Sequence, residues 1–309
     1  MPLDPQLAAI LALTNNAPPL SAGTIQSART GFRFMTVDLR DPATKDAVRS
    51  VEDTTYPAAE GDRPARVFRP DVDGPVPTIL FAHGGAFIMG DIDTHDDHGR
   101  LLCKETGSVV VSIDYRLAPE FPFPAGHDDA AAALRHVFAT VDALGGDPNR
   151  IAVAGDSAGA NLVASAAIMA RDEGLPLAAQ LLFYPPTDFV DEHPSRQEMA
   201  EGYFLTQADM DWIGEQVEFA DLDRSDPRAS LLHHPDLTGV APAVIGTAEF
   251  DPLRDEGEAY AAALEKAGVR VILRRCDGLI HGFVGFTHLS AAADTATRLL
   301  CADLLELLG

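Results

Sequence analysis

The stretch at residues 150–161, RIAVAGDSAGAN, contains the side chain best suited to nucleophilic chemistry. An apolar run at 151–154 predicts a buried parallel strand, and an alanine-rich run at 158–170 predicts a helix. Between them, the GDSAG pattern at 155–159 would form a sharp turn, because its two glycines leave no side chains to obstruct the backbone. The hydroxyl of Ser157 would then project from the sheet edge, beside the positive end of the helix.

A serine hydroxyl needs a general base, a group that orients this base, and donors for the developing oxyanion. In an open α/β sheet, these groups should follow the carboxyl ends of strands. Of the ten histidines, His281 follows the strand predicted at 269–275 and is flanked by glycines, so we predict it as the base. Asp251 comes directly after the preceding strand and is the predicted orienting acid, with Asp255 as the alternative.

Backbone donors for an oxyanion are predicted at two places. The loop after the strand predicted at 78–81 offers the N–H groups of Gly84, Gly85 and Ala86, and the start of the helix offers that of Ala158. A simple β-turn is the other interpretation of the two glycines. The chain order of serine, acid and histidine is the one that α/β-hydrolases use, and it favours the catalytic interpretation.

The remaining histidines have other interpretations. His83 precedes the glycine loop and is expected to brace it. His95 and His98 have a spacing that suits metal ligation, but with no third ligand nearby an ordinary helix start is favoured, so no metal site is predicted. The others are expected to be surface or packing residues: His127, His136, His193, His233, His234 and His288.

Five motifs together resemble one family. They are HGGAF at 83–87, DYRLAPE at 114–120, GDSAG at 155–159, DPLRDEG at 251–257 and HGF at 281–283. In these motifs the chain resembles bacterial esterases of the hormone-sensitive-lipase family, in the subgroup with GDSAG at the nucleophile. The N-terminal MPLDP and the segment EGYFLT at 201–206 are similar too, so the likeness spans nearly the whole chain. It implies an α/β-hydrolase fold with Ser157, His281 and Asp251 as nucleophile, base and orienting acid.

The resemblance also implies roles in binding. The loop donors of the family correspond to Gly85 and Ala86, acting with Ala158. Ala86 stands where the family usually has a third glycine; its N–H remains, but its Cβ occupies space beside the reacting carbonyl. We hypothesise a tighter site that favours small acyl or unbranched alcohol groups. By the same analogy, three residues would line the acyl pocket: Phe204, Leu205 and Met210.

Alternating strand and helix signals predict one α/β-hydrolase core with a mostly parallel sheet, flanked by helices. Two β-prone segments, at 48–56 and 66–69, predict an edge hairpin. Helical segments without strand signals predict a cap over one end of the sheet. The expected division is cap at 1–47 and 188–222, and core at 48–187 and 223–309.

Composition limits the classes of partner. Forty-seven acidic against 23 basic residues give a net charge of −24, which disfavours nucleic acid and anionic membrane surfaces as partners. Three scattered cysteines support neither a disulfide framework nor a structural zinc site. Neither a secretory signal nor a stretch of membrane-spanning length is predicted, so a cytoplasmic location is expected.

The function predicted from the sequence is hydrolysis of short- to medium-chain carboxylic esters through an acyl-enzyme, without a cofactor. Cleavage of an amide or formamide with the same triad is one alternative. A non-catalytic ligand receptor is another, although receptors that resemble this family replace the catalytic histidine, which is present here as His281. The resemblance also implies short acyl chains and a homodimer formed through the edge strand near 269–275.

Overall fold

A computed structural model describes residues 2–14, 19–217 and 223–309. These residues form an eight-stranded sheet with the strand order β1-β2-β4-β3-β5-β6-β7-β8. The strands are β1 Ser50–Ala58, β2 Gly61–Arg69, β3 Val76–Ala82, β4 Val109–Ile113, β5 Gly146–Asp156, β6 Ala179–Phe183, β7 Ala243–Phe250 and β8 Val271–Ile280. Strand β2 runs antiparallel to both β1 and β4, and all other pairs are parallel. The mostly parallel sheet and its edge hairpin are therefore confirmed.

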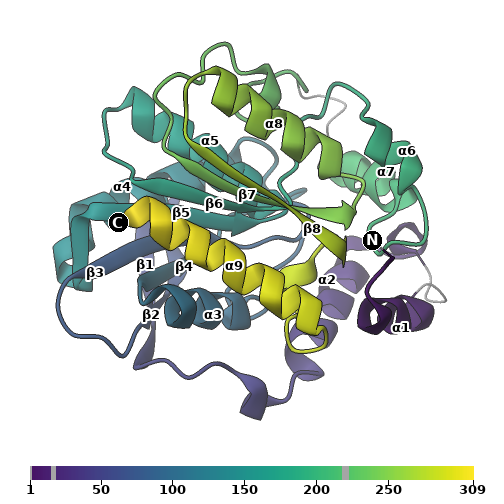
Figure 1. The fold of residues 1–309 in the computed structure, drawn as a ribbon, viewed down its shortest axis with the longest axis horizontal. Coiled ribbons are helices and arrows are strands. Elements are labelled where there is room, and N and C mark those ends of the chain that lie inside the picture. Colours follow the sequence, from purple (N-terminus) through teal and green to yellow (C-terminus); the bar gives the residue numbers. More distant parts are fainter. Residues whose placement is uncertain (1, 15–18, 218–222) are drawn as a thin grey trace.

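Helices cover both faces of the sheet (Figure 1). They are α1 Pro5–Thr14, α2 Ile25–Arg33, α3 Asp96–Thr106, α4 Ala125–Leu144, α5 Ala158–Asp172, α6 Pro194–Glu198, α7 Gln207–Gln216, α8 Arg254–Lys266 and α9 Ala291–Leu308. Shorter helical turns lie at Leu20–Ala22, Phe34–Asp38, Pro42–Thr44, Leu231–His233 and Phe283–Phe286. Helices α4, α5 and α8 contribute to one hydrophobic core and α3 and α9 to a second. Because both faces are covered, every residue of β3 is buried, which explains why all its residues but Thr78 are apolar.

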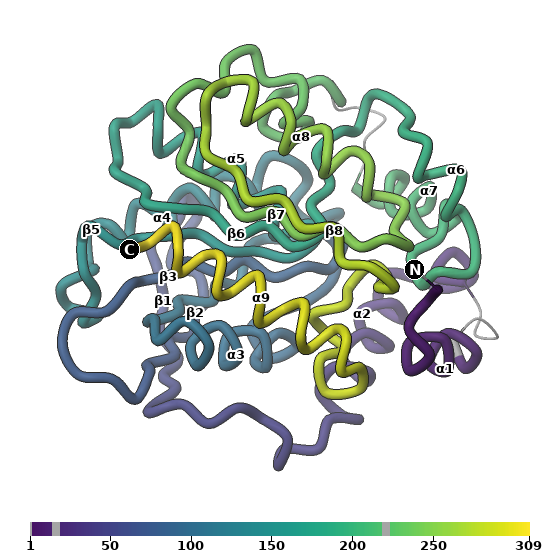
Figure 2. Tube along the Cα trace, in the orientation of Figure 1, coloured from purple at the N-terminus to yellow at the C-terminus, as the bar shows by residue number. Residues whose placement is uncertain are grey.

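The helices α2 and α7, one from each segment predicted as a cap, lie near each other at one end of the sheet, although about 170 residues separate them in sequence (Figure 2). Trp212 of α7 shares a small hydrophobic cluster with Ala28 of α2 and Ile88 of the core. The N–H of Leu20 donates to Asp209 at the start of α7, at 3.3 Å. This cluster also contacts Ala86 and Phe87, so both segments pack against the glycine loop. The predicted boundary at residue 222 lies outside the described residues.

Strand β8 is longer than the sequence predicts. The expected strand ended at residue 275, whereas β8 continues to Ile280 after an irregularity in its pairing with β7. The extension delivers the chain directly to His281 at the carboxyl end of the sheet. Its position beyond β7 also makes β8 an edge strand, as predicted.

Candidate active site

Ser157 is the single residue between the end of β5 and the start of α5. Its φ of 52° and ψ of −122° are unusual for a residue with a side chain, as a sharp elbow requires. The flanking glycines are needed because other backbone lies against them. A Cβ on Gly159 would lie 2.0 Å from the carbonyl oxygen of Ala82, and one on Gly155 would lie 2.5 Å from the backbone of Gly159.

Three side chains from the ends of β5, β7 and β8 form a hydrogen-bonded chain. His281 Nε2 lies 2.9 Å from Ser157 Oγ, and His281 Nδ1 lies 2.8 Å from Asp251 Oδ2. Asp251 is fully buried, and its other oxygen accepts the N–H of Leu253 at 2.9 Å. Because an ionised carboxylate only accepts, it places the proton of a neutral His281 on Nδ1. The lone pair of Nε2 then faces the serine hydroxyl, as a general base requires.

Asp255, the alternative acid, has a different set of contacts. Its carboxylate accepts the N–H of Ser195 at 2.8 Å and pairs with Arg254 at 2.8 Å. These contacts tie α6 to the start of α8, and the acid that contacts the imidazole of His281 is Asp251.

The glycine loop after β3 lies against the serine elbow. The N–H of Gly84 donates to Asp156 Oδ1 at 2.9 Å, so it is not available to an oxyanion, and the prediction for Gly84 is corrected. The N–H groups of Gly85, Ala86 and Ala158 have no acceptor among the residues that the structure describes. Ala86 has a φ of 55°, so an alanine here occupies the left-handed region that favours glycine.

His83 braces this loop through hydrogen bonds, as predicted. Its Nδ1 donates to the carbonyl of Gly84 at 2.7 Å, and the hydroxyl of Tyr115 donates to the carbonyl of His83 at 2.8 Å. Burial lowers the pKa of His83 to about 4, so the ring is neutral near pH 7. His127 is also a buried packing residue; burial lowers its pKa to about 4, and its Nε2 donates to Asn161 Oδ1 at 2.9 Å.

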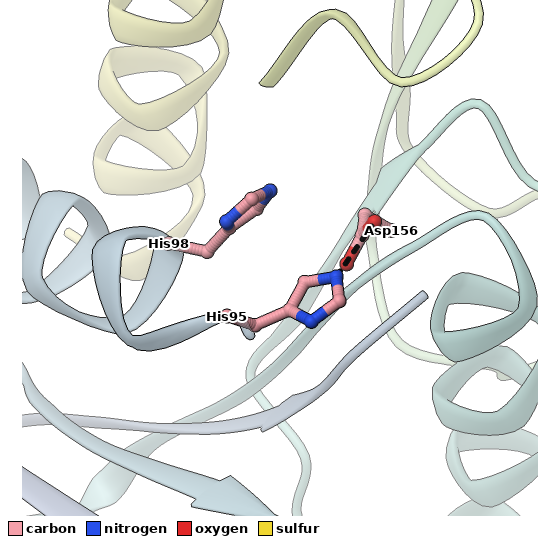
Figure 3. Close-up of side chains that lie close together, drawn as sticks. All are labelled: His95, His98 and Asp156. Atoms are coloured by element: carbon pink, nitrogen blue, oxygen red, sulfur yellow. Dashed lines mark ion pairs between the residues drawn. The ribbon is translucent and has the colours of Figure 1, made fainter. Parts of the chain in front are cut away.

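His95 and His98 belong to a buried cluster that the sequence analysis missed. Figure 3 shows them with Asp156, and one donor atom from each of the three lies within 4.8 Å of the other two. The expectation that no third ligand lies near the two histidines is therefore wrong. Asp156 is about 60 residues away in sequence, and only the packing of α3 beside the end of β5 reveals the cluster.

The residues predicted for the acyl pocket lie in the segment before α7 and in its first turn. Phe204 is close to the site: a Cβ on Gly282 would lie 3.5 Å from its ring. Leu205 and Met210 are half-buried. A small cavity of about 30 Å³, which was not predicted from the sequence, lies beside the glycine loop. Aromatic side chains dominate its lining: Phe87, Tyr115, Phe121, Phe123, His127 and Phe189.

A larger hollow of about 510 Å³ lies between the two predicted cap segments. Thr24 and Arg29 line it from the N-terminal side, and Trp212 and Gln216 of α7 line it from the other. The signals in the sequence for both cavities are the aromatic residues around the DYRLAPE motif and the single tryptophan.

A sequence profile of the family described as α/β hydrolase fold matches residues 79–285, two thirds of the chain. The chain belongs to this family. It is 45% identical to a carboxylic ester hydrolase, LipN, of Mycobacterium tuberculosis, over 82% of this chain and 69% of the relative. It is 35% identical to an ethyl acetate hydrolase of Pseudomonas putida, over 95% and 96%. A hyperthermophilic esterase from Pyrobaculum calidifontis superposes with a TM-score of 0.94 at 40% identity, covering 99% of both chains.

These relatives place the chain among the carboxylic ester hydrolases, and the resemblance to hormone-sensitive-lipase esterases is confirmed. Within the described ranges, no helix has the length and apolar character needed to cross a membrane.

Proposed function

We propose that this chain is a serine carboxylesterase in which Ser157, His281 and Asp251 form the catalytic triad. The observation that carries the proposal is the hydrogen-bonded chain at 2.9 and 2.8 Å that links these three side chains at the ends of three strands. The family membership supports ester hydrolysis as the reaction, because relatives that match most of the chain carry that name.

In the proposed mechanism, Ser157 Oγ attacks the ester carbonyl while His281 Nε2 takes its proton. The N–H groups of Gly85, Ala86 and Ala158 stabilise the oxyanion, and each such donor typically contributes a few kcal/mol to catalysis. His281 then protonates the leaving alkoxide, which departs as the alcohol and leaves an acyl-serine. Water attacks the acyl-serine with the same base, releasing the acid and regenerating the hydroxyl.

We propose small esters with short acyl chains as substrates. The packing of two helical segments against the glycine loop supports a cap over the site, which would limit the length of chain that enters. The position of Phe204 beside Gly282 supports its role in the acyl pocket, with Leu205 and Met210 from the same segment. The relative named ethyl acetate hydrolase is consistent with a short acyl group.

The experiment that tests the proposal is hydrolysis of p-nitrophenyl esters, from acetate to palmitate, by wild type and Ser157→Ala in parallel. The expected result is activity that is highest on the short esters and absent in the alanine variant. Activity that survives Ser157→Ala would contradict the assignment of the nucleophile. Failure on all esters, with turnover of matched anilides, would instead support the amidase alternative.

A further inference from the structure

We infer that His95, His98 and Asp156 form a binding site for a divalent transition-metal ion, with Zn²⁺ as the best match. The three side chains are 3%, 8% and 5% exposed, and their donor atoms lie within 4.8 Å of one another. Two imidazoles and one carboxylate are the ligand types that such ions prefer. The site is separate from the proposed triad, although Asp156 directly precedes Ser157.

The hydrogen bonds around His95 direct a lone pair toward the centre of the site. The hydroxyl of Thr94 donates to the carbonyl of Asp91 at 2.8 Å, and it lies 2.9 Å from His95 Nδ1. Since a hydroxyl has one proton, Nδ1 is the donor in the second contact. A neutral His95 therefore presents the lone pair of Nε2 to Asp156, which is the tautomer that binds a metal.

Asp156 has one oxygen in use and one directed to the cluster. Oδ1 accepts the N–H of Gly84, whereas the Nε2 of His95 lies 3.7 Å from Oδ2. This separation exceeds the length of an N–H···O hydrogen bond and suits two ligands of one tetrahedral ion. The dashed line in Figure 3 marks this contact, which is an ion pair only when His95 is protonated. With a neutral His95, the carboxylate and the imidazole lone pair repel each other, and a cation between them would relieve the repulsion.

His98 completes the set of protein ligands. Its ring packs against Phe81 with the centroids 6.1 Å apart and against His95 at 4.7 Å, and neither of its nitrogens hydrogen-bonds to a described residue. Two histidines and one carboxylate also bind the iron of non-haem oxygenases, but such sites keep several coordination positions open. The burial of the three ligands leaves little room for these open positions. It suits a four-coordinate ion that binds one water in addition to the three side chains.

A second group of potential ligands, Asp188, Asp191 and His233, offers a matched comparison. There, Asp188 Oδ2 already accepts from His193 at 2.9 Å, and Oδ1 accepts from His233 at 3.0 Å. Oδ1 also accepts the N–H groups of Val190 and Asp191, at 2.9 and 3.1 Å. Hydrogen bonds therefore occupy both oxygens of Asp188, and we assign the ion to Asp156.

A bound ion would link three parts of the chain near the nucleophile. It would connect α3, through His95 and His98, to the end of β5 at Asp156. Through the hydrogen bond from Asp156 to Gly84, it would also restrain the glycine loop. The expected role is therefore to stabilise the loop and the elbow, without contact to the reacting atoms.

The test measures bound metal in the intact protein after incubation with ZnCl₂ and removal of the excess. Wild type should retain one Zn²⁺ per chain, and Co²⁺ in its place should give the visible absorption of a tetrahedral site. His98→Phe keeps an aromatic ring to pack on Phe81 but removes both nitrogens, so affinity should fall by more than the roughly 10- to 100-fold that loss of an outer-shell partner causes. His233→Asn, the matched control, should bind as wild type does.

Thermal unfolding gives a second readout. Added Zn²⁺ should raise the Tm of wild type and of His233→Asn, while that of His98→Phe should not change. If His98→Phe does not fold, His98→Asn replaces it. The inference is overturned if wild type retains no Zn²⁺ or Co²⁺, or if His233→Asn loses the metal while His98→Phe keeps it. Either result leaves the proposed esterase function intact, since the ester assays are independent.

Discussion

Replacing Asp251 by Asn tests how the buried carboxylate controls His281. In the structure, Asp251 Oδ1 accepts the N–H of Leu253 at 2.9 Å, and Oδ2 faces His281 Nδ1 at 2.8 Å. The amide oxygen of Asn must keep the first contact, because an N–H can only donate. The NH₂ group therefore takes the second position and requires a lone pair on Nδ1, which moves the ring proton to Nε2. The nitrogen that faces Ser157 then has no lone pair with which to accept its proton.

The expected loss follows from the wrong tautomer. For serine-triad hydrolases, this change lowers kcat by about 10⁴-fold, which is ~5 kcal/mol of transition-state stabilisation. The fold should be retained, because Asn has the shape of Asp and keeps the bond to Leu253. We therefore expect the Tm of Asp251→Asn to stay near that of wild type while hydrolysis of p-nitrophenyl butyrate falls to a trace.

Asp255→Asn is the matched control on the same segment. It alters the contacts with Ser195 and Arg254 but none to His281, so kcat should stay within a few-fold of wild type. If Asp251→Asn kept more than about a tenth of the activity, a loss far below that of a wrong tautomer, Asp251 would not control the tautomer of His281 in this way. An equal loss of kcat in Asp255→Asn would also contradict this role of Asp251.

Three further predictions concern packing, selectivity and pH. Gly159→Ala should lower the free energy of unfolding by more than about 3 kcal/mol or prevent folding, because its Cβ would lie 2.0 Å from the carbonyl oxygen of Ala82. Gly31→Ala is the control: its Cβ would enter open space, so a denaturant titration should show normal folding. Ala86→Gly should shift kcat/KM toward bulkier acyl and alcohol groups, and unchanged preferences would contradict the role given to the Ala86 Cβ. Burial raises the pKa of Asp114 to about 6, above its unfolded value, so this group favours folding at low pH and that contribution is lost as pH rises through about 6. Asp114→Asn should therefore unfold like wild type near pH 4 and be up to ~2 kcal/mol more stable near pH 8; a difference that did not grow with pH would rule out this cause.

Local signals in the sequence were sufficient to identify the proposed nucleophile, base and acid. An apolar strand must end where a glycine-flanked serine and a helix begin, so Ser157 could be placed at a strand exit without coordinates. Parallel strands put their carboxyl ends at one edge, which brought Asp251 and His281 to the same place. The edge hairpin and the edge position of β8 also followed from strand composition and order.

Features that depend on contacts between distant segments could be decided only by the tertiary structure. The N–H of Gly84 is unavailable to an oxyanion because the side chain of Asp156 turns toward it and accepts its hydrogen bond. The sequence does not indicate the rotamer of Asp156, so this contact could not be predicted. The extension of β8 to Ile280 depended on pairing with β7, since strand pairing is set by the partner strand as well as by composition.

One physical cause explains why the proposed triad could be predicted from the sequence and the cluster of His95, His98 and Asp156 could not. The residues proposed for catalysis each follow a strand, and the regular geometry of a parallel sheet converts their sequence positions into proximity. The His95, His98 and Asp156 cluster joins the start of a helix to the end of a strand, and that distance depends on how side chains pack between them. The sequence by itself therefore determined the proposed triad, whereas only the packed structure brought a third ligand to the two histidines.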